Sequence, residues 1–98
     1  MDRNLSKAVS NIVKRCGPTA VATYNGGRGI LVVMESSCTS RAKRTEAVRD
    51  AMGRPGRAFD LAVYTPGEIL ELKGVPGSPV DGILAGCAVV HGSLDGLL

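Results

Sequence analysis

The sequence predicts a small α/β (α+β) domain in which helices pack on one mixed sheet of about four strands. Segments with helical and strand periodicity alternate along 98 residues, a length that suits one domain with a single core. A segment of helical length joins the second and third predicted strands, which is long enough for a parallel crossover. The first two strands are joined by a few residues only, which predicts an antiparallel pair. We therefore expect one domain over residues 1–98, with a loosely held tail over 92–98.

An amphipathic helix is predicted at the start of the chain, because apolar residues recur there at helical spacing: Leu5, Ala8, Val9, Ile12, Val13 and Cys16. Asn4 or Asp2 is a suitable N-terminal cap, and Gly17-Pro18 ends the helix. Two strands follow over 19–24 and 30–34, the second apolar on both faces as in a central strand. Between them Asn25-Gly26 predicts a tight hairpin, since both residues accept a positive φ.

A second helix is predicted from about Arg41 to Met52, with an inner face of Ala42, Thr45, Val48 and Met52. The run over 58–65 is a strand in which Phe59, Leu61 and Val63 share one face and Asp60, Ala62 and Tyr64 share the other. Pro66-Gly67 opens a short helix. Ser78-Pro79 starts another, which runs to Gly86, and residues 87–91 form a last short strand.

The composition excludes several classes of function. Aromatic residues make up 3% of the chain, which argues against binding single-stranded nucleic acid by base stacking. No apolar run approaches the roughly 20 residues of a membrane-spanning helix, and no signal peptide is recognisable, so no membrane partner is expected. The three cysteines lie far apart, as reduced thiols do, and no metal site is predicted from them. The chain is predicted to be cytoplasmic.

The stretch FDLAVYTPGEILEL, followed by GSPVDGILAGCAVVHG, resembles the C-terminal part of the minimal nucleotidyltransferases, relatives of the DNA polymerase beta palm domain. Members of that family have a strand with one acid, a short helix, and a later helix that leads into a last strand. The resemblance covers residues 58–92 most specifically. Upstream, GILVVMESS and the charged helix after it are similar to the second strand and the crossover helix of the family.

The resemblance implies a site with three parts. A Gly-Ser pair after the first strand holds the triphosphate through backbone N–H groups. An Asp-x-Asp pair on the second strand and a third Asp on the next strand hold two magnesium ions. In this sequence Asp60 matches the third Asp, but Gly27 and Gly29 stand where the pair belongs, with Arg28 between them. The Gly-Ser pair is absent, so the site is predicted to be degenerate.

No other acid is expected to restore that site. Glu35 follows the opposite end of the second strand, about 20 Å away at the rise of a β-strand, whereas the two metals of such a site lie about 3.5–4 Å apart. Nothing in the sequence places Asp2 near it. Asp60 is therefore interpreted as a remnant carboxylate that is solvated or paired with Arg28 across the sheet, and catalysis by the mechanism of the family is not expected.

Two further groups of residues are candidates for binding. Backbone N–H groups of the glycine turn suit a phosphate, which makes Gly26, Gly27, Arg28 and Gly29 candidate nucleotide-binding residues. A basic face suited to nucleic acid or an acidic partner is formed by Arg41, Lys43, Arg44, Arg49, Arg54 and Arg57. Cys38 and His91 lie far apart in sequence, and no cysteine-dependent enzyme is predicted from them.

These features favour a nucleotidyltransferase-like domain that acts as a non-catalytic interaction module. It is expected to bind a protein partner, a second copy of itself or nucleic acid, and to need no cofactor. Two alternatives stay open. The first is an active nucleotidyltransferase that transfers a nucleoside monophosphate and uses Mg²⁺ in a rearranged site around Asp60 and Arg28. The second is binding of a nucleotide or polyphosphate at the glycine turn without chemistry.

Overall fold

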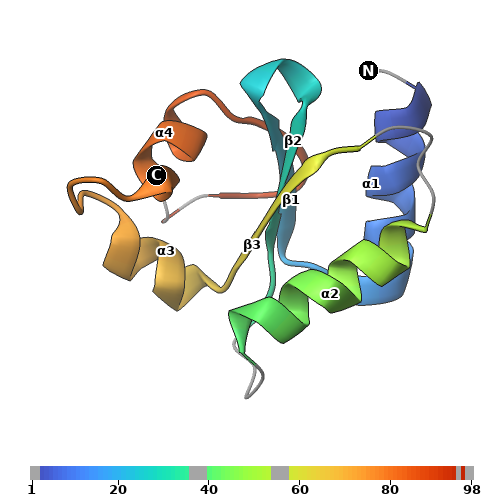
Figure 1. Cartoon of the computed structure of the whole chain (residues 1–98), viewed down its shortest axis with the longest axis horizontal. Helices are drawn as coiled ribbons and strands as arrows, with labels where there is room; N and C mark the ends of the chain where they lie inside the picture. Colours follow the sequence, from blue (N-terminus) through green and yellow to red (C-terminus); the bar gives the residue numbers. More distant parts are fainter. Residues whose placement is uncertain (1–2, 36–39, 54–57, 95, 97–98) are drawn as a thin grey trace.

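The fold is a four-stranded mixed sheet covered by helices on both faces, which confirms the predicted fold class. A computed structural model describes residues 3–35, 40–53, 58–94 and 96. Helices α1 (Arg3–Cys16) and α2 (Arg41–Met52) cover one face of the sheet, and α3 (Pro66–Leu72) and α4 (Pro79–Ala85) cover the other. Figure 1 shows these two layers on either side of the strands.

The strands are β1 (Ala20–Tyr24), β2 (Gly29–Val33), β3 (Asp60–Tyr64) and β4 (Ala88–Gly92), in the order β3-β2-β1-β4. The pairs β1–β2 and β1–β4 are antiparallel, while β2–β3 is parallel and is joined by the α2 crossover. All five residues of β2 are buried, which confirms its prediction as a central strand. The two ends of the sheet are therefore the outer edges of β3 and β4.

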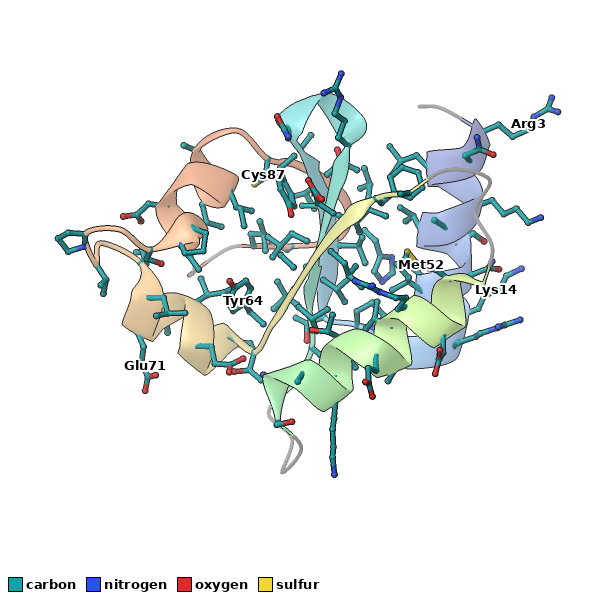
Figure 2. All side chains as sticks on the ribbon, viewed as in Figure 1. Arg3, Lys14, Met52, Tyr64, Glu71 and Cys87 are labelled. Carbon is teal, nitrogen blue, oxygen red and sulfur yellow. The ribbon has the colours of Figure 1, made fainter. Side chains whose placement is uncertain are left out.

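Two hydrophobic cores lie on the two faces of the sheet. Alternation along the strands sends Ile30, Val32 and Val63 toward α1 and α2, and Leu31 and Tyr64 toward α3 and α4. Figure 2 shows Met52 in the first of these layers and Tyr64 in the second. The predicted alternation along 58–65 is thus confirmed, although β3 itself is shorter than the predicted strand.

Local sequence signals explain most of the element ends. Asn25 and Gly26 have φ values of 55° and 68°, as predicted for this pair, but the loop is longer than a two-residue turn: it spans residues 25–28 and includes the 3-10 turn η1 (Asn25–Gly27). Ser40, Thr65 and Ser78 cap α2, α3 and α4 through their side-chain oxygens. At the start of α1, Asn4 lies inside the helix rather than at its cap, and Asp2 lies outside the described residues.

Two predictions about packing hold only in part. On α2 Val48 and Met52 are buried as predicted, but Ala42 is exposed and Thr45 half-buried, while Arg44 and Ala51 are buried instead. The tail is not loose throughout either, since Leu94 is 2% exposed and packs in the core beside α3 and α4. An apolar side chain buried to this extent holds its segment against the domain.

Candidate functional site

Three residues form a row across the sheet at the place where the resemblance puts the metal-binding carboxylates. Tyr24 on β1 is in register with Gly29 on β2, and Gly29 is in register with Asp60 on β3. Residues that are in register on neighbouring strands point to the same face of a sheet. The side chains of Tyr24 and Asp60 therefore share a face, and a side chain at position 29 would point to that face too. This is the face that α3 and α4 cover.

The ring of Tyr24 occupies the space above Gly29. A Cβ atom placed on Gly29 would lie 2.3 Å from Tyr24 Cζ and 2.4 Å from its Cε2, far inside van der Waals contact. A side chain at position 29 and the present position of the ring therefore exclude one another. Tyr24 was not among the predicted site residues, because a two-residue Asn-Gly turn would place it across from Gly27. The observed loop has four residues, 25–28, and places Tyr24 across from Gly29 instead.

The other candidate acids and glycines do not join this row. Gly27 has a φ of 88°, and a Cβ built on it would meet Leu5 of α1 at 3.5 Å, so it faces the opposite layer. Glu35 follows the far end of β2, as predicted, where it accepts a hydrogen bond from Thr19 Oγ1 at 3.1 Å. Of the two glycines expected to replace acids, only Gly29 lies next to Asp60.

The suggested pairing of Arg28 with Asp60 takes place through the main chain and not through the side chains. The Asp60 N–H donates to the Arg28 carbonyl at 2.9 Å, and no ion pair joins the two residues. Both residues are exposed, which leaves their charged groups to water. Of the two alternatives for Asp60, solvated or paired with Arg28, the structure shows the solvated carboxylate, because the parallel ladder joins only the backbones of the two residues.

A shallow hollow lies beside the row, between the hairpin and α4. One part, of about 270 Å³, follows the outer edge of β3 and is bounded by Thr45 of α2 and Ile83 of α4. A wider part, of about 510 Å³, is lined by Asn25 and Gly26 of the hairpin and by residues of α4. Tyr24 lines both parts. Gly26 alone among the candidate glycines lines this hollow.

The environment of Tyr24 raises the pKa of its hydroxyl above the ordinary value of 10.0. Partial burial is the main cause, and the negative charge of Asp60 and the neighbouring Tyr64 add to it. In a Tyr64→Phe background Tyr24 is the sole tyrosine, so its titration can be followed by tyrosinate absorbance. We expect Asp60→Asn to lower the pKa of Tyr24 in that background, because the charge that opposes ionisation is removed. An unchanged pKa would contradict the placement of Asp60 beside the ring.

The basic face is smaller in the structure than the sequence suggested. Arg44 is 6% exposed and forms an ion pair with Glu68, so it is not a surface cation. Lys43 and Arg49 are exposed on α2, but so are Glu46 and Asp50 on the same helix. Arg54 and Arg57 lie outside the described residues, as does the side chain of Arg41. The described exposed charges of α2 therefore balance, and no positive patch is visible among them.

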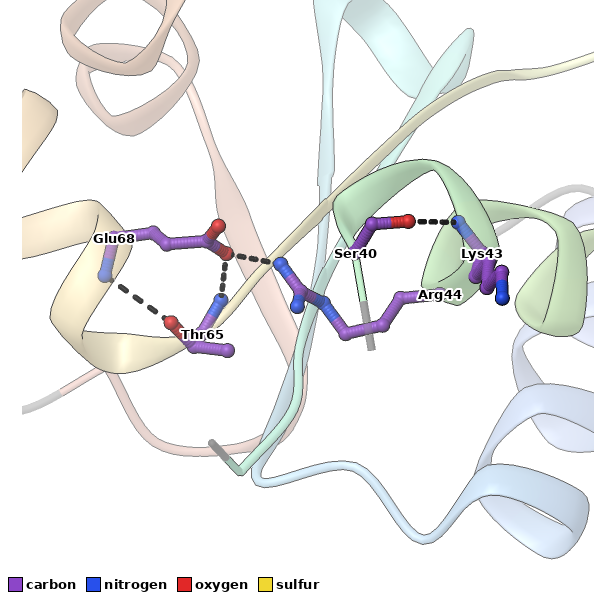
Figure 3. Close-up of polar contacts among 5 residues, drawn as sticks. All are labelled: Ser40, Lys43, Arg44, Thr65 and Glu68. Carbon is purple, nitrogen blue, oxygen red and sulfur yellow. Dashed lines mark hydrogen bonds and ion pairs between the residues drawn. The ribbon is translucent and has the colours of Figure 1, made fainter. Parts of the chain in front are cut away.

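The ion pair between Arg44 and Glu68 links the two helical layers around the C-terminal end of β3 (Figure 3). Glu68 Oε1 also accepts from the Thr65 N–H at 2.9 Å, and Thr65 Oγ1 accepts from the Glu68 N–H at 3.2 Å. Burial by itself raises the pKa of Glu68, but these hydrogen bonds and the Arg44 charge outweigh it, so the pKa lies below its ordinary value of 4.5. The capping-box pattern Thr-x-x-Glu could have revealed this residue in the sequence.

Within the described part of the chain, no three His, Cys, Asp or Glu side chains gather closely enough to hold a metal ion. Cys16 and Cys87 are free thiols, and burial raises the pKa of Cys16, while Cys38 lies outside the described residues. His91 lies on β4, in register with Val21. No helix among the described residues has the length and apolar character to cross a membrane.

Comparison of the chain with known proteins finds no matching family model, no matching curated protein and no matching solved structure.

Proposed function

We propose that this chain is a nucleotidyltransferase-like domain whose catalytic site is closed by its own tyrosine, and that it acts as a non-catalytic protein-interaction module. The observation that carries the proposal is the ring of Tyr24 above Gly29, next to Asp60. A two-metal site needs several carboxylates around one small volume. The second carboxylate position beside Asp60 has no side chain and its space is filled by an aromatic ring.

Protein is favoured over nucleic acid as the partner. Binding to a nucleic acid backbone depends on clustered Lys and Arg side chains, and the exposed charges described on α2 are balanced. Apolar side chains are exposed instead at Leu70, Val75, Val89 and Val90. Two of them, Val89 and Val90, adjoin one another on β4, and neighbouring exposed apolar residues of this kind are typical of an interaction site. Nucleic-acid binding through Arg41, Arg54 and Arg57 would give an affinity that falls steeply with salt concentration.

An active nucleotidyltransferase is the second candidate, and the hollow beside Asn25 and Gly26 favours it. It would need Tyr24 to swing away and Asp60 to hold Mg²⁺ together with the phosphates of the nucleotide. The two candidates make opposite predictions for the same experiment.

The experiment is an amide NMR titration with ATP and Mg²⁺ up to millimolar concentration. We expect no shift at the amides of Gly26, Gly27 and Gly29, because the ring of Tyr24 covers the one glycine that neighbours Asp60. A Tyr24→Ala variant serves as the control in which that space is open. Shifts in the unmodified chain that disappear in Asp60→Ala, or transfer of labelled nucleotide to any acceptor that depends on Asp60, would establish the active enzyme instead.

A further inference from the structure

β4 is an open edge of the sheet. It pairs with β1 on one side, and no strand of the described chain lies on its other side. An edge strand offers unpaired N–H and C=O groups to any other strand that reaches it, and proteins usually protect such an edge with charges, bulges or covering elements. β4 contains a bulge at Val90, since the consecutive residues Val21 and Ala22 of β1 pair with His91 and Val89, but β4 has no Asp, Glu, Lys or Arg.

The apolar residues of β4 are exposed rather than used in either core. Val89 is 44% exposed and Val90 is 39% exposed, and the neighbouring Ala88 is exposed as well. None of the three belongs to the clusters on the two faces of the sheet. The strand therefore presents apolar side chains and free backbone groups at the same place, which is the combination that strand addition uses.

The two edges of this sheet differ in charge. β3 begins with the exposed acid Asp60, and its outer edge lies in a hollow bounded by Thr45 of α2 and Ile83 of α4. β4 lies in a stretch, residues 82–94, that contains no Asp, Glu, Lys or Arg. A charged residue on an edge strand discourages pairing with a strand of another chain, and β4 has no such residue. The edge of β4 is therefore the one open to a further strand.

We propose that the partner of β4 is the β4 strand of a second copy of this chain, in an antiparallel pair across a two-fold axis. This inference deepens the proposed function, since it names the partner of the interaction module. A two-fold axis places the same surface of each copy opposite itself, so the surface must be complementary to itself. Residues 82–94 are the longest stretch without Asp, Glu, Lys or Arg, and two copies can therefore pair there without bringing like charges into contact.

The dimer would extend the sheet of each copy into one continuous sheet across the axis. Pairing of one short strand buries less than the roughly 1,200 Å² of a stable interface, so we expect a dissociation constant on the order of 10–100 µM. Because of this weak affinity, the association must be measured over a wide range of concentrations.

The test is sedimentation equilibrium of the full chain with reductant, from about 5 µM to about 1 mM, which brackets the expected dissociation constant. The mass should rise from 10.1 kDa toward twice that value. Val89→Lys should weaken the association at least tenfold, because it places two like charges next to each other at the axis. Val75→Lys is the matched control, since Val75 is 43% exposed against 44% for Val89 but lies between α3 and α4, and it should change the association less than about twofold.

Hydrogen exchange of the unmodified chain gives a second measurement that needs no variant. The amides of β4 should exchange more slowly at high than at low concentration, while those of β3 should not change. A chain that stays at 10.1 kDa throughout, or equal weakening by both lysine variants, would overturn the proposal and leave this edge to a different protein. The nucleotide titration examines Gly26 and Gly29 on another surface, so a failure here is distinguishable from a failure of the proposed function.

Discussion

Replacement of Arg44 by alanine is expected to lower the free energy of unfolding by about 2–3 kcal/mol. Arg44 is 6% exposed, and its guanidinium holds Glu68 of α3 from the opposite helical layer (Figure 3). Without it the carboxylate of Glu68 keeps its hydrogen bond from Thr65 but loses its cation. The Glu68 side chain is 31% exposed, so water can reach it, and the loss should stay below that of a fully buried pair.

Urea unfolding at neutral pH measures this effect, and Arg49→Ala is the control. Arg49 is exposed on the same helix, so its replacement should change stability by no more than about 0.5 kcal/mol. A double replacement, Arg44→Met with Glu68→Gln, should recover part of the loss, because no charge is then left without a partner. If Arg44→Ala and Arg49→Ala cost the same, the ion pair does not contribute to the stability of the fold.

The same ion pair predicts a dependence on pH. The pKa of Glu68 is lower in the folded chain than its ordinary value of 4.5. Its contribution is therefore present in full above the pKa of the unfolded chain, and it is lost as the pH falls through the lower pKa of the folded chain. Stability should thus decrease on acidification below about pH 4.5, and by less in Glu68→Gln than in the unmodified chain.

The replacement Gly29→Ala is expected to destabilise the chain by about 2 kcal/mol, through the contact with Tyr24 rather than through the backbone. Gly29 is not among the residues with positive φ, so alanine fits its backbone. The new Cβ would lie 2.3 Å from Tyr24 Cζ, which forces the ring away from the sheet. Packing of an aromatic ring over a glycine in the neighbouring strand stabilises a sheet, and this contact would be lost.

A double-mutant cycle separates the ring from the backbone. In a Tyr24→Ala background the space is open, and Gly29→Ala should become neutral or stabilise by about 0.4–1 kcal/mol, the usual effect of this replacement at a compatible site. Gly82→Ala is the control in the unmodified chain. Gly82 lies in α4, and no atom lies within 4 Å of the position that a new Cβ would take. Alanine at this helical position should therefore raise the free energy of unfolding of the chain by roughly 0.5–1 kcal/mol. Equal effects of Gly29→Ala in both backgrounds would contradict the position of the ring.

Much of the fold follows from the sequence because its signals are local. The spacing of Leu5, Ala8, Val9 and Ile12 identifies the buried face of α1, and Asn25-Gly26 identifies the hairpin. Proline after a capping residue identifies the starts of α3 and α4. Each of these signals depends on neighbours within about four residues, and therefore needs no knowledge of where distant segments lie.

The contacts between distant segments cannot be read from local sequence signals and follow from the folded chain alone. The burial of Arg44 depends on Glu68, 24 residues away, and a charged side chain is otherwise expected at the surface. The position of β4 beside β1, and of Leu94 in the core, depends on strand pairing across the whole chain. Residue periodicity tells which side chains share a face, whereas sheet order and packing tell which faces meet. For this reason the sequence predicted a vacated site around Asp60, whereas the ring of Tyr24 above the neighbouring Gly29 is visible only in the folded chain.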